Sequence, residues 1–204
     1  MNKEYKFTEN WFEFGEDLGE FLPVGTDEEI HILEIGSFEG KSTIWFLDNL
    51  LRNEKSTITC VDPWNKYSQD EDSFNSYSKE ETQWDFRSHY ETFLFNINLS
   101  GKKNQVIVKK GYSHTLLPKM ITEEKKYDLI FVDGNHTSPF VLTDAVMGWY
   151  LLKENGIIVF DDYLWGDPGS TNSPKIAIDS FVEIFKDYTE VIWEGLRKSV
   201  KKIK

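Results

Sequence analysis

The sequence contains very little cysteine and no long run of apolar residues. Cys60 is the only cysteine among 204 residues, so no disulfide can form within the chain, and a lone cysteine in an apolar run is usually a small buried residue. No apolar stretch approaches the roughly 20 residues of a membrane-spanning helix, and residues 1–5 contain no apolar signal segment. We therefore expect a cytoplasmic protein with no membrane partner.

Basic residues are also scarce. Lysine and arginine number 23 against 35 aspartates and glutamates, which gives a formal net charge of −12. A nucleic-acid or anionic-membrane binder needs a basic surplus to neutralise phosphates, and the only basic run here is 197–204. We expect a small-molecule partner and no nucleic acid. The length suits a single domain over 1–204 with one large core.

The first informative stretch is a strand, a glycine-rich turn and a helix. Ile32 to Ile35 form an apolar run typical of a buried strand, Gly36 and Gly40 bracket a turn, and Ser42 opens an amphipathic helix. Glycine lets the backbone approach a ligand closely, and a helix N-terminus presents N–H groups to an anionic group. This unit predicts a site for a small, partly anionic ligand. An ordinary turn between a strand and a helix is the alternative interpretation.

A second strand is predicted at 57–62, and it ends in an acid. Asp62 follows Gly40 by 22 residues, about the separation at which the acid of a nucleotide-binding βαβ unit accepts hydrogen bonds from ribose hydroxyls. A turn aspartate before Pro63 is the alternative. Together with the glycine turn, Asp62 indicates a nucleotide-like ligand.

Two further apolar strands, 127–132 and 156–160, are separated by a helix at 141–152. A strand, helix, strand unit of this length forms a right-handed crossover, so the two strands are parallel and, as neighbours, lie about 4.8 Å apart. The residues that follow the two strands should therefore converge at one edge of the sheet.

Three acids and a histidine follow those strands. Asp133 and His136 come after the first, and Asp161 and Asp162 come after the second. Three crowded carboxylates are costly unless a cation or a proton compensates them, and hard oxygen ligands suit Mg²⁺. We predict a divalent metal site at Asp133, Asp161 and Asp162, with His136 as a general base. Structural capping by the acids, with an ordinary loop histidine, is the alternative.

The remaining chain predicts a doubly wound α/β fold. Residues 11–22 carry apolar side chains at helical spacing and predict an N-terminal helix on the domain or on a partner chain, within a helical segment at 1–29. Residues 65–89 are polar, acidic and aromatic and predict an insertion or lid, with a surface loop as the alternative. The other predicted elements are a helix at 90–99, a strand at 105–110, a loop at 111–113, a helix at 174–185 and two strands at 189–193 and 196–200.

Five motifs occur in order, each at the end of a predicted strand. They are Glu34-x-Gly36-Ser37-x-x-Gly40-x-Ser42, Val61-Asp62-Pro63-Trp64, Gly111-x-Ser113, Asp133-Gly134-x-His136 and Asp161-Asp162-Tyr163-x-Trp165. Together they resemble the class I S-adenosylmethionine-dependent methyltransferases. The chain looks most like the branch of the macrocin-type, antibiotic-sugar O-methyltransferases, and more distantly like catechol O-methyltransferase, from about Ile30 to Lys201.

This resemblance implies a Rossmann-like, seven-stranded sheet, mostly parallel with an antiparallel last strand and helices on both faces. It implies that S-adenosylmethionine lies across the carboxyl ends of the first strands, with Asp133 near both the cofactor and the metal. The implied cofactor-binding residues are Glu34, Gly36, Ser37, Gly40 and Ser42 for the methionine part, Asp62 for the ribose, and Trp64, Gly111 and Ser113 near the adenine. Asp133, Asp161 and Asp162 match metal-binding acids of Mg²⁺-dependent members, and His136 matches a catalytic base.

The implied reaction is direct methyl transfer from the sulfonium to an oxygen of a small hydroxylated metabolite. The metal would lower the pKa of the hydroxyl, and His136 would take its proton. The sequence does not distinguish a sugar from a phenol, nor a monomer from a homo-oligomer. The alternatives are a metal-independent methyltransferase, a nicotinamide-dependent dehydrogenase, whose G-x-G-x-x-G order the turn at 36–40 lacks, and a non-catalytic binding module.

Overall fold

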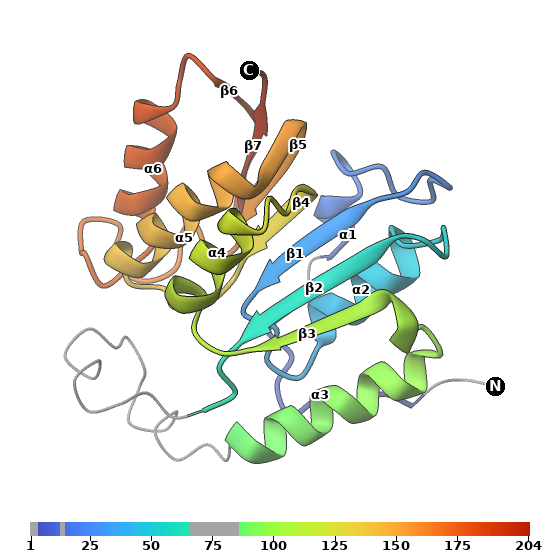
Figure 1. The fold of residues 1–204 in the computed structure, drawn as a ribbon. Helices are drawn as coiled ribbons and strands as arrows, with labels where there is room; N and C mark the ends of the chain where they lie inside the picture. The colour runs from blue at the N-terminus through green and yellow to red at the C-terminus, as the bar shows by residue number, and fades with distance from the viewer. Residues whose placement is uncertain (1–3, 13–14, 66–85) are drawn as a thin grey trace.

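The computed structural model describes residues 4–12, 15–65 and 86–204 (Figure 1). The strands are β1 (His31–Ile35), β2 (Thr57–Asp62), β3 (Val106–Lys110), β4 (Tyr127–Val132), β5 (Leu152–Phe160), β6 (Thr189–Glu194) and β7 (Lys198–Lys202). The helices are α1 (Gly15–Leu18), α2 (Lys41–Asn49), α3 (Phe86–Ser100), α4 (Ser113–Thr122), α5 (Ser138–Leu151) and α6 (Lys175–Ile184), with a 3-10 turn, η3, at Lys103–Gln105.

The strands form one seven-stranded sheet in the order β3-β2-β1-β4-β5-β7-β6. The strands from β3 to β5 are parallel, and β7 lies antiparallel between β5 and β6 (Figure 1). The predicted fold, with its antiparallel last strand, is confirmed. The predicted parallel pairing of β4 with β5 is also confirmed, and it brings the residues that follow these two strands to the same edge.

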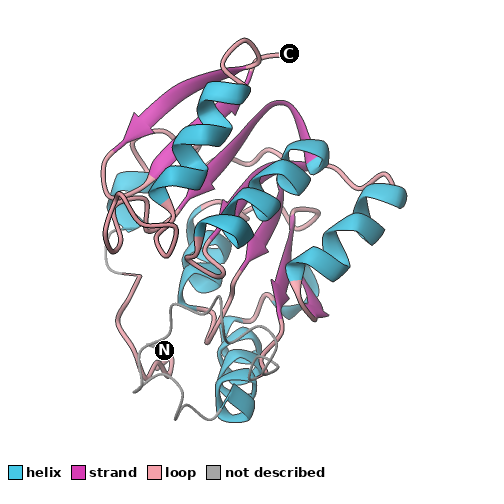
Figure 2. Ribbon diagram, turned by 90° about the vertical axis from the view of Figure 1, so that its left-hand side faces the viewer, coloured by secondary structure: helices cyan, strands magenta, loops and turns pink. Residues whose placement is uncertain are grey.

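Alternation along the strands divides the core into two layers. Ile32 of β1 packs with Phe46 of α2 and Phe93 of α3, whereas Leu33, the next residue, packs with Val141 of α5. Successive strand side chains point to opposite faces, so α2 and α3 cover one face of the sheet while α4, α5 and α6 cover the other (Figure 2). In the described part of the chain, no helix combines the length and apolar character of a membrane span.

Several element boundaries differ from those that the sequence predicts. The predicted helix at 11–22 is wrong: α1 covers only Gly15–Leu18, and Gly19, which follows it, disfavours continuation because glycine is costly in a helix. Helix α4 was not predicted, since Pro118 inside it is a strong helix-breaking signal. Of the predicted insertion at 65–89, residues 66–85 lie outside the described residues, and residues 86–89 open α3.

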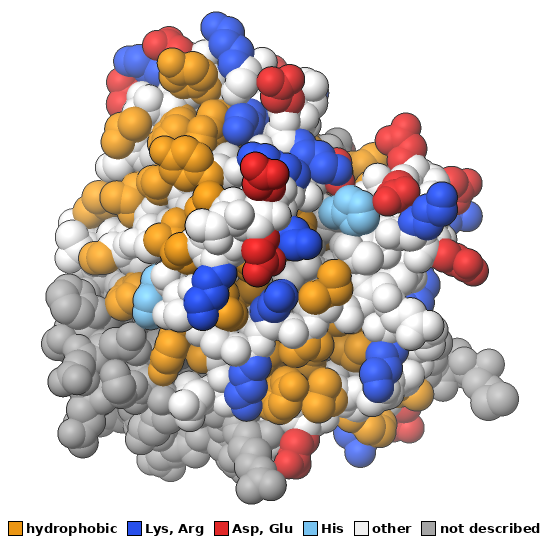
Figure 3. Space-filling view, viewed as in Figure 1, with side chains coloured by type: hydrophobic (Ala, Val, Ile, Leu, Met, Phe, Trp, Pro, Cys, Tyr) orange, Lys and Arg blue, Asp and Glu red, His pale blue; other side chains and the backbone are white. Residues whose placement is uncertain are grey.

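The outer surface carries mixed charges together with some apolar side chains. In the view of Figure 3 apolar side chains gather over the region of α5 and α6 and also over the region of β3 and α3, with lysines, arginines and acids between and around them. Ile184 at the end of α6 is 69% exposed and Tyr150 on α5 is 58% exposed. Single exposed apolar residues are usual on protein surfaces, and the candidate site lies elsewhere, at the carboxyl ends of the parallel strands.

Gly36 lets the end of β1 approach the end of β4. Its φ is +87°, and a Cβ at this position would lie 1.9 Å from the carbonyl oxygen of Asp133 and 2.9 Å from Cα of Gly134. The Asp133 N–H donates to the carbonyl of Ile35 at 2.8 Å. Because neither backbone can move without breaking the sheet, only glycine fits at position 36, and its absence of a side chain sets the position of Asp133.

Replacement of Gly36 by alanine should therefore destabilise the protein severely. Gly101 is the matched control, since its φ is +76° but a Cβ there would have no atom within 4 Å in the described structure. We expect Gly101→Ala to cost about 1 kcal/mol, the cost of a left-handed residue, and Gly36→Ala to cost more than about 3 kcal/mol because it adds a backbone clash. Urea unfolding of both variants measures the difference, and equal midpoints would contradict the proposed close approach.

Candidate active site

A cavity of about 390 Å³ lies at the carboxyl ends of β1, β2, β4 and β5. Its walls come from the glycine turn, the residues after β2, the start of α4, the residues after β4 and β5, and the N-terminal segment. The predicted site residues that line it are Gly36, Ser37, Ser42, Asp62, Trp64, Ser113, Asp133, His136, Asp161 and Asp162. Glu34, Gly40 and Gly111 are not among its lining residues.

Glu34 supports the glycine turn from below. Its side chain is fully buried, and its carboxylate accepts hydrogen bonds from the hydroxyls of Ser37 at 2.6 Å, Ser42 at 2.7 Å and Thr43 at 2.5 Å. Burial raises the pKa of Glu34, and the hydroxyl bonds act in the opposite direction. Glu34 thus orients the residues of the turn and of the start of α2, and its direct contact with the methionine part stays a prediction.

Asp62 joins the turn after β1 to the turn after β2. One carboxylate oxygen accepts the backbone N–H groups of Ser37 and Phe38, both at 3.0 Å, and the other accepts the Trp64 N–H at 2.7 Å. Burial raises the pKa of Asp62, although these bonds lower it in part. A carboxylate has about four acceptor positions, so three are in use. Capacity remains for about one ribose hydroxyl, where the sequence alone suggested two.

Trp64 is a rigid wall of the cavity. Its backbone has a φ of +41°, its indole N–H donates to the carbonyl of Phe38 at 2.6 Å, and its ring lies 4.8 Å from the ring of Tyr90 and 4.7 Å from that of Phe93. A Cβ at Gly40 would lie 2.9 Å from the Phe93 ring. Gly40 therefore permits close packing between α2 and α3, and its predicted part in cofactor binding stays a prediction.

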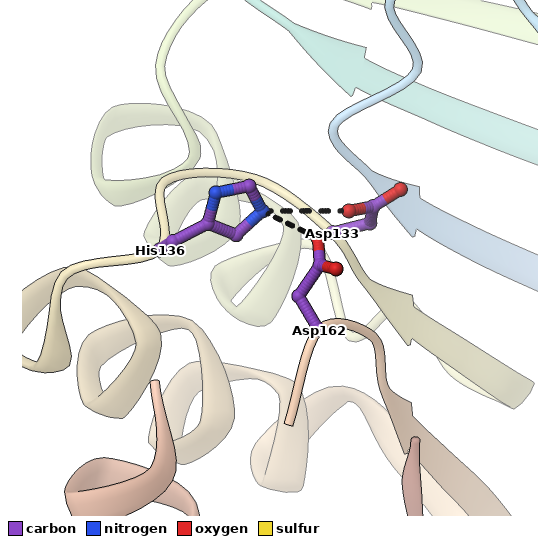
Figure 4. Close-up of side chains that lie close together, drawn as sticks. All are labelled: Asp133, His136 and Asp162. Atoms are coloured by element: carbon purple, nitrogen blue, oxygen red, sulfur yellow. Dashed lines mark ion pairs between the residues drawn. The ribbon is translucent and has the colours of Figure 1, made fainter. Parts of the chain in front are cut away.

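The ends of β4 and β5 bring Asp133, His136 and Asp162 together (Figure 4). The imidazole Nε2 lies 2.9 Å from a carboxylate oxygen of Asp162 and 3.7 Å from one of Asp133. One potential ligand atom from each residue falls within 4.8 Å of the others. Asp162 has a φ of +53°, an uncommon conformation for an aspartate. The three residues form what we call the transfer centre.

The charges in the transfer centre are strongly coupled. Burial alone would lower the pKa of His136, but the neighbouring Asp133 and Asp162 carboxylates raise it to about 10. The same contact lowers the pKa of Asp162, against the effect of burial. Burial, together with the nearby Asp161, raises the pKa of Asp133 well above its usual range. At pH 7 the imidazole is therefore protonated and balances one carboxylate.

Asp161 forms a separate ion pair in the structure, and its predicted role as a metal ligand stays a prediction. Its carboxylate lies 2.8 Å from Nε of Arg197, and a second Arg197 nitrogen lies 2.7 Å from the carboxylate of Asp17 on α1. Only 4% of the Arg197 side chain is exposed. Burial raises the pKa of Asp161 to about 6, while Arg197 lowers it in part. The positive charge of Arg197, at the turn between β6 and β7, thus compensates Asp161.

The N-terminal segment forms a wall that the sequence did not reveal. Glu39 is 1% exposed, and its carboxylate accepts bonds from the Thr8 N–H at 2.6 Å and the Thr8 hydroxyl at 3.0 Å. Trp11 stacks on Phe38 of the glycine turn, with ring centroids 5.1 Å apart. The available signal in the sequence was Glu39, an acidic residue in the turn between Gly36 and Gly40.

Asp144 is a second residue that sequence reasoning missed. It lies on α5, is 2% exposed and lines the cavity, and its Oδ1 has no hydrogen-bond partner among the residues that the structure describes. Burial raises its pKa to about 7, and a hydrogen bond with Ser113 lowers it in part. A single acid within the apolar run of α5 was the available signal, since a buried acid needs a reason.

The raised pKa of Asp144 predicts a specific pH dependence of stability. A carboxyl whose folded-state pKa is above its unfolded value stabilises the protein at low pH, and this contribution is lost as the pH rises through about 7. Asp144→Asn has the same shape and cannot ionise. We expect its melting temperature to exceed that of the wild type by a margin that grows from pH 5 to pH 8. A difference in melting temperature between the two proteins that does not change with pH would show that Asp144 is not held in a costly ionised form.

The fold and the site together define a class of protein: a Rossmann-like enzyme with a glycine turn, an acid after the second strand and a reactive cluster after the fourth and fifth. A family model described as a methyltransferase domain matches residues 33–163. The chain belongs to this methyltransferase family. The predicted class, a class I S-adenosylmethionine-dependent methyltransferase, is confirmed, and the macrocin-type branch stays a prediction.

One protein of similar sequence comes from a virus. An uncharacterized protein of Acanthamoeba polyphaga mimivirus is 28% identical over 137 residues, which cover 67% of this chain and 52% of the relative. The chain thus spans about half the length of that relative.

Three solved structures share the fold at low identity. An O-methyltransferase of Bacillus cereus in complex with SAH has a TM-score of 0.61 and 18% identity, covering 85% of this chain and 74% of that one. TomG of Streptomyces achromogenes, an O-methyltransferase of tomaymycin synthesis in complex with SAM, has a TM-score of 0.61 and 17% identity, with 85% and 73% covered. An SAH-bound methyltransferase of Podospora anserina has a TM-score of 0.55 and 19% identity, with 85% and 72% covered.

Proposed function

We propose that this protein transfers the methyl group of S-adenosylmethionine to a hydroxyl oxygen of a small molecule, either a sugar or a phenol. The observation that carries the proposal is a single cavity that contains both the glycine turn with Asp62 and the transfer centre. A methyl donor and the group that accepts the hydroxyl proton must lie side by side. The O-methyltransferases of Bacillus cereus and Streptomyces achromogenes, solved with SAH and SAM, support this proposal.

The residues of the glycine turn fit the donor. Gly36 leaves space where any side chain would meet Asp133, and the first turn of α2, starting at Lys41, presents backbone N–H groups suited to the methionine carboxylate. The acids of the cavity suit the positive sulfonium and ammonium groups. The net charge of −12 supports a small-molecule acceptor and argues against nucleic acid.

The transfer centre has the chemistry to remove a proton from the acceptor. S-adenosylmethionine supplies an electrophilic methyl group, and the acceptor oxygen attacks it in line with the departing sulfur. His136 is the base in this proposal. With a pKa of about 10 it is protonated at pH 7, so it can accept a proton only when another positive charge compensates the adjacent Asp133 and Asp162 carboxylates.

A divalent cation such as Mg²⁺ fits this requirement. Asp133 and Asp162 supply carboxylate oxygens within 4.8 Å of each other and of a nitrogen of His136, and oxygen ligands suit both Mg²⁺ and Mn²⁺. When bound, such an ion supplies a Lewis acid that lowers the pKa of the acceptor hydroxyl. We propose that Asp133 and Asp162 hold it and that Asp161 stays with Arg197. A metal-independent transfer, in which protonated His136 remains paired with Asp162, is the second candidate.

Cofactor binding should depend on Asp62. Asp62→Ala removes the remaining acceptor for the ribose, worth about 1.5–3 kcal/mol as a charge-assisted bond, and it also releases Ser37 and Phe38. We expect calorimetric titration to show S-adenosylmethionine binding at least tenfold weaker. Asp27→Ala, at a site that is 86% exposed, is the control and should leave affinity unchanged.

The change in melting temperature on ligand addition distinguishes S-adenosylmethionine from a nicotinamide cofactor. S-adenosylmethionine should raise the melting temperature of the wild type and NAD should not. Unchanged affinity in Asp62→Ala would mean that this carboxylate serves the turn alone.

The choice of metal ligands is tested by comparing two neighbouring acids. Methyl transfer to a panel of sugars and phenols, followed by mass spectrometry, should stop after chelation while S-adenosylmethionine binding persists. Asp162→Asn should lower the rate by orders of magnitude, with partial recovery at high Mg²⁺, because it weakens a ligand. Asp161→Asn should not recover with Mg²⁺, because its partner is Arg197.

Asp187→Asn, which changes an exposed acid outside the cavity, is the matched control. Full activity of metal-free protein in excess EDTA would contradict the cation and favour the second candidate. Recovery of Asp161→Asn with Mg²⁺ would place Asp161 among the ligands.

A further inference from the structure

Asp162 is the residue through which the end of β5 enters the transfer centre, and its backbone has an uncommon conformation. Its φ is +53°, a left-handed value that residues other than glycine rarely adopt. Its carboxylate lies 2.9 Å from Nε2 of His136. A residue in such a conformation persists only where the surrounding structure holds it there. The neighbours of Asp162 in the chain, Asp161 and Tyr163, show how it is held.

The residue before Asp162 is fixed by the sheet and by an arginine. The Asp161 N–H donates to the carbonyl of Val132 at 3.0 Å, and the Asp161 carboxylate lies 2.8 Å from Nε of Arg197. The N–H of Asp162 in turn donates to the Asp161 carboxylate at 3.0 Å. The backbone that enters Asp162 is therefore held on both its main-chain and its side-chain groups.

The residue after Asp162 is fixed by a buried polar cluster. Tyr163 is 3% exposed, and its hydroxyl donates to the carboxylate of Asp179 on α6 at 2.8 Å. The same hydroxyl accepts from Nζ of Lys175 at 2.8 Å and from Nζ of Lys198 at 3.1 Å. A hydroxyl has one donor and two acceptor positions, so all three are in use. We call Tyr163, Lys175, Asp179 and Lys198 the tyrosine anchor.

Arg197 and Lys198 are consecutive residues at the start of β7, and they open the basic run 197–204. Lys198 pairs with the last residue of β5, so both side chains lie beside the turn that carries Asp162. Successive side chains of a strand point to opposite faces of the sheet. Arg197 accordingly reaches Asp161 on the face of α1, and Lys198 reaches Tyr163 on the face of α6. Two adjacent cations thus hold the residues on either side of Asp162 from opposite faces.

The tyrosine anchor is charged although it is buried. The Lys198 side chain is only 8% exposed, and its Nζ lies 2.9 Å from Asp179 and 3.0 Å from Glu194. Burial alone would lower the pKa of Lys198, but its bonds to Asp179, Tyr163 and Glu194 raise it, so the ammonium group stays charged. Apolar side chains of similar volume often replace a buried ion pair without loss of stability. The charged cluster therefore indicates a requirement for a defined position of Tyr163 rather than for stability.

We propose that Tyr163 and Lys198 are positioning residues, which direct the Asp162 carboxylate into the transfer centre. This inference rests on the proposed function, because it takes a divalent cation as the ligand of that carboxylate. No residue of the tyrosine anchor lines the cavity, so the anchor acts only through Asp162. Groups that orient the ligands of a metal commonly change its affinity by about 10-fold to 100-fold when they are replaced.

Tyr163→Phe tests the role of the hydroxyl, because it keeps the ring and removes only the bonds of the anchor. The control is Tyr150→Phe, the same change at a side chain of α5 that is 58% exposed. Mn²⁺ binding is followed by electron paramagnetic resonance and S-adenosylhomocysteine binding by calorimetry. We expect Tyr163→Phe to bind Mn²⁺ at least about tenfold more weakly, with its affinity for S-adenosylhomocysteine within about twofold of the wild type. The control should match the wild type for both ligands.

Lys198→Met is a second variant that removes the cation from the β7 side of the anchor. It should weaken Mn²⁺ binding in the same way. Crystals grown without metal give a readout that does not depend on the cation. In Tyr163→Phe the Asp162 carboxylate should move from its 2.9 Å contact with His136 to more than about 3.5 Å, beyond hydrogen-bond distance.

Each contrary result overturns a defined part of the proposal. Wild-type affinity for Mn²⁺ in folded Tyr163→Phe and Lys198→Met would exclude both as positioning residues. Equal losses of Mn²⁺ and S-adenosylhomocysteine binding would show a general structural role instead. If the wild type itself binds no Mn²⁺, the proposed cation fails. An unmoved Asp162 in metal-free Tyr163→Phe crystals would overturn the positioning role, so the two failures are distinguishable.

Discussion

The hydrogen bonds from the Asp62 carboxylate to three backbone N–H groups hold the cavity together. They connect the turn after β1 with the turn after β2, and they fix Trp64, which packs on α3. The turn is held further by the Trp64 indole N–H, which donates to the carbonyl of Phe38. The same carboxylate must also face the ligand, so the structure uses one buried charge both to shape the site and to bind within it.

The acids of the cavity are compensated in different ways, and the differences indicate what each one does. Glu34 is compensated by three hydroxyls and Asp161 by Arg197, so neither needs a ligand to balance its charge. Asp162 is paired with His136, an arrangement that a cation can replace. Asp144 keeps an acceptor, Oδ1, that has no partner among the residues the structure describes. Buried charge that the protein does not balance itself is where a ligand gains most.

Much of the fold was predictable from the sequence because it depends on short-range patterns. The runs of β2 and β4 were predicted with the same bounds that the structure has, since continuous apolar stretches between polar turns are typical of buried parallel strands. The helix that includes Pro118 was missed, because tertiary packing overrides an unfavourable local signal. The N-terminal helix was predicted too long. The apolar side chain of Trp11, which was assigned to one face of that helix, instead stacks on Phe38 of the glycine turn.

The location of the site could be predicted from the sequence, but the ion pairs between its residues could be predicted less well. Parallel topology brings Asp133, His136 and Asp162 together, and that convergence follows from strand order alone. Strand order does not show which acid pairs with Arg197. This arginine lies 36 residues beyond Asp161 in the sequence and reaches it only because β7 inserts beside β5. Likewise Thr8 reaches Glu39 from a segment without regular structure. Contacts between distant residues of this kind leave no local pattern.

A crystal structure of the protein with S-adenosylhomocysteine and Mn²⁺ tests the central claim most directly, since anomalous scattering locates the metal unambiguously. The account predicts the methionine part at the glycine turn, the ribose at Asp62, and the metal between Asp133 and Asp162, with Asp161 still paired with Arg197. A metal bound by Asp161 with Arg197 displaced, or a cofactor that lies away from the glycine turn, would contradict it.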